Sequence, residues 1–354
     1  MNGSPRTLHS LSAARDPPMN TTTALTPPSL PTGVAASVAV AGAAAALSSL
    51  PGVSAYGFGW LPLAVSLGIV IGNLWPSLPS RGAEGFRLAR GTLMRAGIAF
   101  YGLRIGIDEL GRVGWSGLLM AVVIVLSTFG LALALGRRLG LDPQVAVLVG
   151  CGSAICGAAA VAAADSVIGA RARHVSAAVL AVVVFGTLGM YLLPLLHPLT
   201  GLSDQSFGLW VGLTVHELGH VVAGAEAAGP GAAASALVEK MMRVMLLAPV
   251  VMLIAARWRN GGATGSCSPG VPPFLYGFIA MMALNASGLL PVWLHALGAE
   301  AAQALLAVGL AALGANTRLA DLAQAGWRVW ALAALLWMWL LLAGFGLVSF
   351  GALS

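Results

Sequence analysis

The chain has 354 residues, of which 58% are hydrophobic and only 8% are charged. Soluble domains carry about 25% charged residues, so this composition excludes an ordinary soluble domain. The formal net charge of +6 comes almost entirely from arginine, since Lys240 is the only lysine. No dense basic run interleaved with aromatic residues occurs, and no nucleic-acid partner is expected.

Residues 1–32 are rich in Pro, Ser and Thr, which predicts a disordered N-terminal tail. Residues 33–354 are predicted to form one multi-pass transmembrane domain, because apolar stretches recur that match the ~17–25 residues needed to cross a bilayer. These stretches are 33–50, 58–75, 91–107, 115–136, 143–165, 174–197, 207–228, 236–256, 272–290, 302–316 and 327–349. The predicted fold class is therefore an all-α polytopic membrane protein, with the lipid bilayer as its partner.

An internal repeat relates two halves of this domain, residues 58–197 and 207–349. At a fixed offset of 212 residues, matching pairs include Asn73 with Asn285, Gly97 with Gly309, Gly102 with Gly314 and Trp115 with Trp327. The stretches from 58 to 136 and those from 272 to 349 are seven stretches apart, so simple alternation inverts this copy. A weaker match relates 143–197 to 207–256, and it is inverted only if 143–165 and 207–228 are re-entrant. Inverted repeats are typical of secondary transporters, and we predict a bundle of that kind.

Two stretches, 143–165 and 207–228, are predicted to be discontinuous. Each contains glycines and small polar residues in the middle of an apolar stretch, in the runs 150–157 and 212–219. Non-helical backbone at that membrane depth is tolerated only where it is buried in protein or lines a cavity. The two stretches are therefore expected to be broken helices or re-entrant hairpins.

Arginine placement bears on that choice. If both stretches are re-entrant hairpins, Arg171 and Arg173 lie in the cytoplasm with the other arginine-rich loops, as the positive-inside rule favours. Full crossing helices are the alternative, and the sequence leaves both open. Our hypothesis is nine spans and two opposed hairpins, whose tips lie near Ser153 and near residues 214–220.

The most polar part of an apolar stretch contains His216, Glu217 and His220. In a helix, the spacing H-E-x-x-H places both imidazoles on one face, where they could bind zinc with Glu217 as general base. The pattern is similar to that of intramembrane zinc metalloproteases of the site-2 type, which need a third protein ligand. No such ligand is evident, so a protease with His216 and His220 as metal ligands is the alternative prediction.

The same residues suit a solute pathway, in which no residue is catalytic and no cofactor is needed. Helix N-termini at chain breaks attract anions, and Glu217 or His216 could carry a coupled proton. The predicted pathway residues are Ser153, Cys156, Thr214, His216, Glu217, His220, Lys240, Arg243, Asn73 and Asn285.

Simpler structural roles stay open for four of these residues. Lys240 and Arg243 lie three residues apart and either supply positive charge to the pathway or snorkel to the membrane interface. Asn73 and Asn285 are expected mainly to form hydrogen bonds between helices.

Several longer runs are distinctive, namely RAGIAFYGLR at 95–104, GSAICGAAAV at 152–161, FGTL at 185–188, VHE at 215–217 and KMMRVMLLAP at 240–249. Together they resemble the YeiH family of bacterial inner-membrane proteins over nearly everything after the N-terminal tail. The resemblance implies a multi-pass protein of the bacterial plasma membrane, with a fold similar to the cation/proton antiporter and anion transporter superfamily.

Members of this family are labelled sulfate exporters, so the resemblance implies a transporter, not an enzyme, that exports a small inorganic or sulfonated anion. One departure concerns His220, because the family usually reads His-Glu-x-x-Gln. The resemblance therefore implies that the second histidine of the zinc-like motif is incidental to this chain. The number of subunits is open, and a homodimer is one option.

Overall fold

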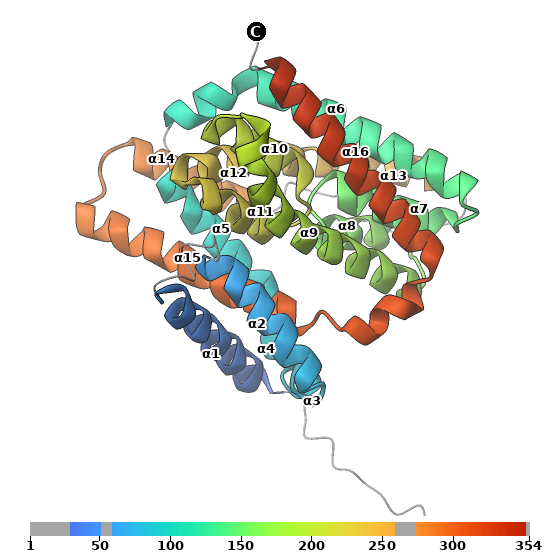
Figure 1. Ribbon diagram of the computed structural model, residues 1–354, viewed down its shortest axis with the longest axis horizontal. Coiled ribbons are helices and arrows are strands. Elements are labelled where there is room, and N and C mark those ends of the chain that lie inside the picture. Colours follow the sequence, from blue (N-terminus) through green and yellow to red (C-terminus); the bar gives the residue numbers. More distant parts are fainter. Residues whose placement is uncertain (1–28, 51–58, 106, 259–272, 352–354) are drawn as a thin grey trace, which may run out of the picture.

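The computed structural model describes residues 29–50, 59–105, 107–258 and 273–351. Every regular element in these ranges is helical (Figure 1). The α-helices are α1 (Leu30–Ser48), α2 (Trp60–Leu74), α3 (Ser77–Arg81), α4 (Ala83–Leu88), α5 (Met94–Tyr101), α6 (Ile107–Arg138), α7 (Pro143–Ala154), α8 (Ala158–Ile168), α9 (Ala172–Thr200), α10 (Asp204–Thr214), α11 (Leu218–Ala225), α12 (Pro230–Met245), α13 (Leu247–Trp258), α14 (Pro273–Ala286), α15 (Val292–Ala315) and α16 (Trp327–Gly351). Short 3-10 or π segments extend or link them: η2 (Ala89–Leu93), η3 (Gly102–Arg104), η4 (Glu226–Ala228) and η6 (Leu319–Ala325).

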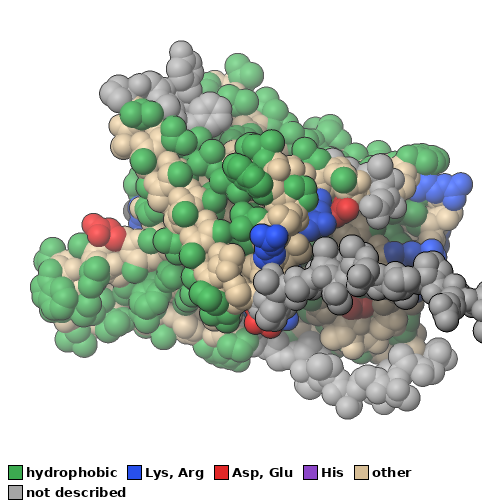
Figure 2. All heavy atoms as spheres, turned by 90° about the horizontal axis from the view of Figure 1, so that it is seen from below, with side chains coloured by type: hydrophobic (Ala, Val, Ile, Leu, Met, Phe, Trp, Pro, Cys, Tyr) green, Lys and Arg blue, Asp and Glu red, His purple; other side chains and the backbone are tan. Residues whose placement is uncertain are grey.

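Five helices are long and apolar enough to cross a membrane: α1, α9, α15, α16 and the part of α6 from Val113 to Arg138. Large apolar side chains such as Trp115 and Leu342 are exposed on them. Figure 2 shows hydrophobic side chains over most of one face, with Lys and Arg gathered toward one side of it. A broad apolar surface of this kind needs a membrane around it. The predicted all-α polytopic membrane fold is confirmed.

The helices form two groups that lie side by side (Figure 1). The α15 group consists of α1, α2, α4, α5, α14 and α15, and the α12 group consists of α6–α13 and α16. Glycines let helices of the α15 group approach closely: a β-carbon at Gly72 of α2 would collide with the backbone of Ala315 in α15. Small residues serve this purpose in membranes, where close backbone packing replaces the hydrophobic effect between helices.

Two asparagines form matching hydrogen bonds inside the α15 group. Nδ2 of Asn73 donates to the carbonyl of Thr317 at 2.9 Å. Nδ2 of Asn285 donates to the carbonyl of Ile105 at 3.1 Å. The repeat offset of 212 residues converts one bond into the other, since it relates the two donors and also the two acceptors. An approximate two-fold axis between the repeats would produce this exchange, and both amides have the structural role expected for them.

Helix boundaries differ from the predicted stretches at several places, including the following three. α1 begins at Leu30, because Oγ of Ser29 caps the N–H of Thr32, whereas the predicted tail extends to residue 32. The stretch predicted at 302–316 begins ten residues earlier, at Val292. The stretch predicted at 115–136 is longer, and α6 carries a kink at Gly114, where φ is 42°. Residues 1–28 of the predicted tail lie outside the described residues.

Each of the two discontinuous segments returns to the end of the bundle at which it started. Nδ1 of His174, at the start of α9, lies 3.2 Å from Oε1 of Gln144, at the start of α7, so α7 and α8 together double back. α10 starts beside the start of α12, where a β-carbon at Gly208 would collide with the backbone of Ala232. Since α11 leads into α12, it also returns toward the start of α10. The position of these segments in a bilayer stays a prediction.

Candidate functional site

Two chain breaks meet inside the α12 group. α7 ends at Ala154 and α8 begins at Ala158, while α10 ends at Thr214 and α11 begins at Leu218. The first break depends on Gly157, whose φ of 67° is rarely adopted by residues with a side chain. In the second break the backbone is extended at Val215 and at Glu217. Two carbonyl ends and two N–H ends of helices are thereby exposed within the protein.

Arg243 of α12 joins the carbonyl ends of α7 and α10. Its guanidinium donates to the carbonyls of Ser153 and Ala154 in α7, and to those of Gly212 and Leu213 in α10. The five hydrogen bonds measure 2.6–2.9 Å, and Arg243 is fully buried. Helix C-termini carry partial negative charge and unpaired carbonyls, so one guanidinium satisfies both ends at once.

Lys240 lies one turn before Arg243 and has a similar role. It is fully buried, and its Nζ donates to the carbonyl of Val215 at 2.6 Å. The snorkelling alternative is therefore wrong for both residues, because neither side chain reaches the surface. Their positive charge instead acts on the chain breaks through backbone carbonyls.

The carboxylate of Glu217 lies at the N-terminal end of α8. Its Oε1 accepts a hydrogen bond from the backbone N–H of Ala158 at 2.5 Å. The approach requires a glycine at position 157, because a β-carbon on Gly157 would collide with this carboxylate. The charges of Lys240 and Arg90 are close enough to stabilise it. The protein thus places its own anionic group where a helix N-terminus favours one.

His216 and His220 do not share a helix. His216 lies in the break, because the backbone is extended at the next residue and α11 begins only at Leu218. The prediction that both imidazoles lie on one helical face is wrong. Both do lie against α9, where a β-carbon at Gly186 would be 2.9 Å from Nδ1 of His220 and 3.6 Å from Cβ of His216. Nε2 of His220 lies 3.4 Å from Oγ1 of Thr187.

A metal site would need more ligands than these two histidines. Within the described ranges, no group of three or more His, Cys, Asp or Glu side chains is placed to hold a metal ion. The zinc-ligand set His216 and His220 therefore gains no third ligand from the described residues.

The remaining predicted pathway residues divide into two places. Ser153 and Cys156 are buried at the first break, and Oγ1 of Thr214 donates to the carbonyl of Leu340 in α16 at 3.2 Å. Asn73 and Asn285 lie apart, in the α15 group. The structure therefore brings together Ser153, Cys156, Thr214, His216, Glu217, His220, Lys240 and Arg243.

Some polar atoms at the breaks have no hydrogen-bond partner among the described residues. They include Oγ of Ser153 and Nδ1 of both His216 and His220. Buried polar groups are almost always satisfied in native proteins, so unsatisfied ones in a cluster mark a place where a solute or water can bind.

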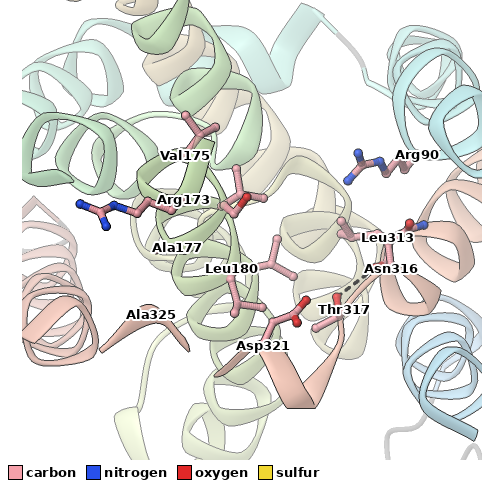
Figure 3. Close-up of a pocket in the computed structure, with 13 residues that line it drawn as sticks. Arg90, Arg173, Val175, Ala177, Leu180, Leu313, Asn316, Thr317, Asp321 and Ala325 are labelled. Carbon is pink, nitrogen blue, oxygen red and sulfur yellow. Dashed lines mark hydrogen bonds between the residues drawn. The ribbon is translucent and has the colours of Figure 1, made fainter. Parts of the chain in front are cut away.

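A cavity of about 530 Å³, lined by none of the predicted pathway residues, lies between α9, the C-terminal end of α15 and η6. Figure 3 shows Arg90 on one side of it and residues of α9, including Arg173 and Leu180, on the other. Asn316, Thr317 and Asp321 also line it. The lining comes from three separate stretches of the chain, residue 90, residues 173–183 and residues 313–325, and the only sequence signal was that arginines gather in loops predicted to face the cytoplasm.

A second unanticipated feature joins the two helix groups. Oε1 of Glu226 accepts hydrogen bonds from the hydroxyl of Tyr101, Nη1 of Arg104 and Nε2 of Gln303 at 3.0–3.2 Å. Gln303 and the cavity residue Leu313 both lie on α15, ten residues and so about 15 Å apart along its axis. Along α15, the two helix groups are therefore separated by the cavity near Leu313 and joined by the hydrogen bonds of Glu226 near Gln303.

Residues 32–333 match the family described as Conserved hypothetical protein 698. The UPF0324 membrane protein PA5383 of Pseudomonas aeruginosa is 41% identical over 328 residues, with 88% of this chain and 92% of the relative covered. The UPF0324 inner membrane protein YeiH of Escherichia coli K12 is 39% identical over 319 residues, with 88% of this chain and 91% of the relative covered. YeiH of Salmonella typhimurium is 38% identical over 319 residues, with the same coverage of both chains.

No solved structure matches this chain. The five membrane-length helices and the inner-membrane relatives agree on a multi-pass protein of the bacterial inner membrane. The match over residues 32–333 and the identity of these relatives over most of their length show that the chain belongs to the UPF0324 family of membrane proteins, the family of YeiH.

Proposed function

We propose that this protein is a secondary transporter that exports a small inorganic or sulfonated anion of the sulfate type. The observation that carries the proposal is the pair of breaks, with Arg243 on the carbonyl ends of α7 and α10 and Glu217 on the N–H end of α8. Burying such groups at membrane depth is costly, and they mark solute pathways in membrane proteins. Discontinuous helices are where secondary transporters bind their solutes.

The polar groups at the breaks favour an anion over a cation. The carbonyl ends that would attract a cation are already bound by Arg243 and Lys240. The N–H ends of α8 and α11 remain, the first held by Glu217 and the second without a side-chain cap. An anion binding at α8 would replace the Glu217 carboxylate. That carboxylate would leave most easily as the neutral acid, which couples anion binding to a proton.

The junction between the helix groups supports alternating access. The cavity opens it at the level of Arg90 and Arg173, whereas the hydrogen bonds of Glu226 close it at the level of Gln303. In the opposite state the Glu226 bonds would open and the cavity would close. Because arginines concentrate on cytoplasmic loops, the cavity is assigned to the cytoplasmic side. The homodimer stays an option that this mechanism neither needs nor excludes.

The proposed membrane topology keeps nine spans and two opposed hairpins. Its support is that Arg90 and Arg173 line one cavity, although a full crossing of α7 and α8 would place them on opposite sides of the membrane. We expect a cysteine in place of Arg173 to react with a membrane-impermeant maleimide in inverted vesicles, but not in intact cells. Ser203→Cys, at the start of α10, is the matched control and should react only from the outside. If Arg173→Cys reacted in intact cells and not in inverted vesicles, the hairpins would be rejected.

Flux measurements test transport directly. Proteoliposomes that contain the purified protein and radioactive sulfate, or an alkylsulfonate, should release the anion at least about tenfold faster than protein-free liposomes, since bare bilayers strongly exclude charge. Radioactive rubidium ions, measured in the same vesicles, serve as the control for leaks and should not be released faster. If no anion of the panel moves faster than in protein-free liposomes, the proposed function is wrong. The metalloprotease is not proposed, because the break removes the helical geometry that favoured it.

A further inference from the structure

The cavity between α9 and the C-terminal end of α15 has a lining that fits a small oxyanion. Its volume of about 530 Å³ is many times the ~30 Å³ of a liquid water molecule, so a hydrated anion fits inside. Arg90 and Arg173 contribute two positive charges and Ser176 a hydroxyl, against one acidic side chain, Asp321. Within the described part of the chain, neither guanidinium forms a hydrogen bond or ion pair.

Arg90 connects this cavity to the chain breaks. Its side chain is exposed where it borders the cavity (Figure 3). Its guanidinium also lies within electrostatic range of the Glu217 carboxylate. Positive charge in a recess with low-dielectric walls raises the local concentration of anions. Arg90 therefore draws anions toward the place where Glu217 binds the end of α8.

The walls of the cavity continue to the breaks. Val183 of α9 lines the cavity, and Gly186, about one turn farther along α9, lies against His220. Leu313 of α15 lines the opposite wall, and Leu310, about one turn earlier, lies against a glycine in the first turn of α11. The inner end of the cavity is thus about one helical turn from the groups that flank Glu217.

We infer that this cavity is a binding vestibule for a small oxyanion, such as sulfate or an alkylsulfonate, and that Arg90 holds the anion there before it reaches the breaks. A guanidinium suits this role because its paired N–H groups match two oxygens of an oxyanion. The inference rests on the proposed function and names the first residue that its substrate contacts.

The charge of the vestibule is measured with a cysteine placed at Ser176. The quantity is the ratio of the reaction rate with an anionic methanethiosulfonate reagent to the rate with a cationic one. In purified detergent-solubilised protein, this rate ratio should be higher for the Ser176→Cys thiol than for a free thiol in solution. Adding Arg90→Gln should lower that rate ratio about tenfold, since one unit charge is removed near the thiol. Adding Arg87→Gln is the matched control, because Arg87 is exposed nearby but does not line the cavity. An unchanged ratio with Arg90→Gln would overturn the inference.

Anion binding is measured by protection of the same cysteine. Sodium sulfate, compared with sodium chloride at equal ionic strength, should slow labelling of Ser176→Cys and should not slow it in the Arg90→Gln background. Protection that persists without Arg90, or that is absent in both proteins, contradicts the vestibule. Labelling measures anion binding without transport, so it tests the vestibule independently of the proposed function. Arg90-dependent protection without transport rejects only the proposed function, and transport without such protection rejects only the vestibule.

Discussion

Replacing Arg243 with methionine should leave little folded protein. The change removes five hydrogen bonds and leaves buried carbonyls of α7 and α10 without donors. Hydrogen bonds to a charged group contribute about 1.5–3 kcal/mol each. Even with strong overlap among them, the loss approaches the whole net stability of a typical protein, about 5–15 kcal/mol. The measurement is the fraction of protein that stays monodisperse after heating, determined by size-exclusion chromatography in detergent.

Two further variants make the Arg243 prediction specific. Arg257→Met removes an exposed arginine at the end of α13 and should leave the melting temperature unchanged within a few degrees. Arg243→Lys keeps the charge but loses the planar fork that reaches two helices, so its melting temperature should lie between those of the parent and Arg243→Met. A melting temperature of Arg243→Met equal to that of the parent would show that the two helix ends do not depend on this residue.

The roles of Lys240 and Arg243 show where sequence reasoning stopped. Their spacing identified two cations in one apolar segment, but the predicted partners were the solute of the pathway or the solvent at the membrane interface. Their partners are backbone carbonyls 25–90 residues away. Backbone acceptors leave no mark on side-chain sequence, so only the folded chain shows them. The network of Glu226 was missed for a related reason, because its donors lie 77–125 residues away in other segments.

The fold was more accessible to sequence reasoning than the site. Apolar length alone predicted the helical membrane protein, and glycine runs predicted where α7 and α10 would end. The repeat offset correctly paired Asn73 with Asn285 as equivalent amides. The helical interpretation of H-E-x-x-H was wrong, because it rested on the spacing of the residues within the motif alone. Tertiary contacts at Val215 and at the Glu217 side chain instead accompany an extended backbone there.

Replacing Glu217 with glutamine should abolish proton-driven transport and preserve the fold. The amide oxygen of glutamine can still accept the hydrogen bond of Ala158, so the melting temperature should stay within a few degrees of the parent. Glutamine cannot bind or release a proton, so a pH gradient should no longer drive sulfate accumulation in proteoliposomes. Exchange of sulfate for sulfate at equal pH should continue, because the neutral amide, like the neutral acid, can be replaced by the anion at the end of α8.

Glu300→Gln is the matched control for Glu217→Gln, because Glu300 is an exposed carboxylate of α15 away from the breaks. It should leave both proton-driven accumulation and exchange unchanged. The decisive quantity is the ratio of the two activities, since a merely damaged protein would lose both together. Proton-driven accumulation that survives in Glu217→Gln would mean that another group carries the proton. The carboxylate on α8 would then be a fixed structural cap that the transported anion never replaces.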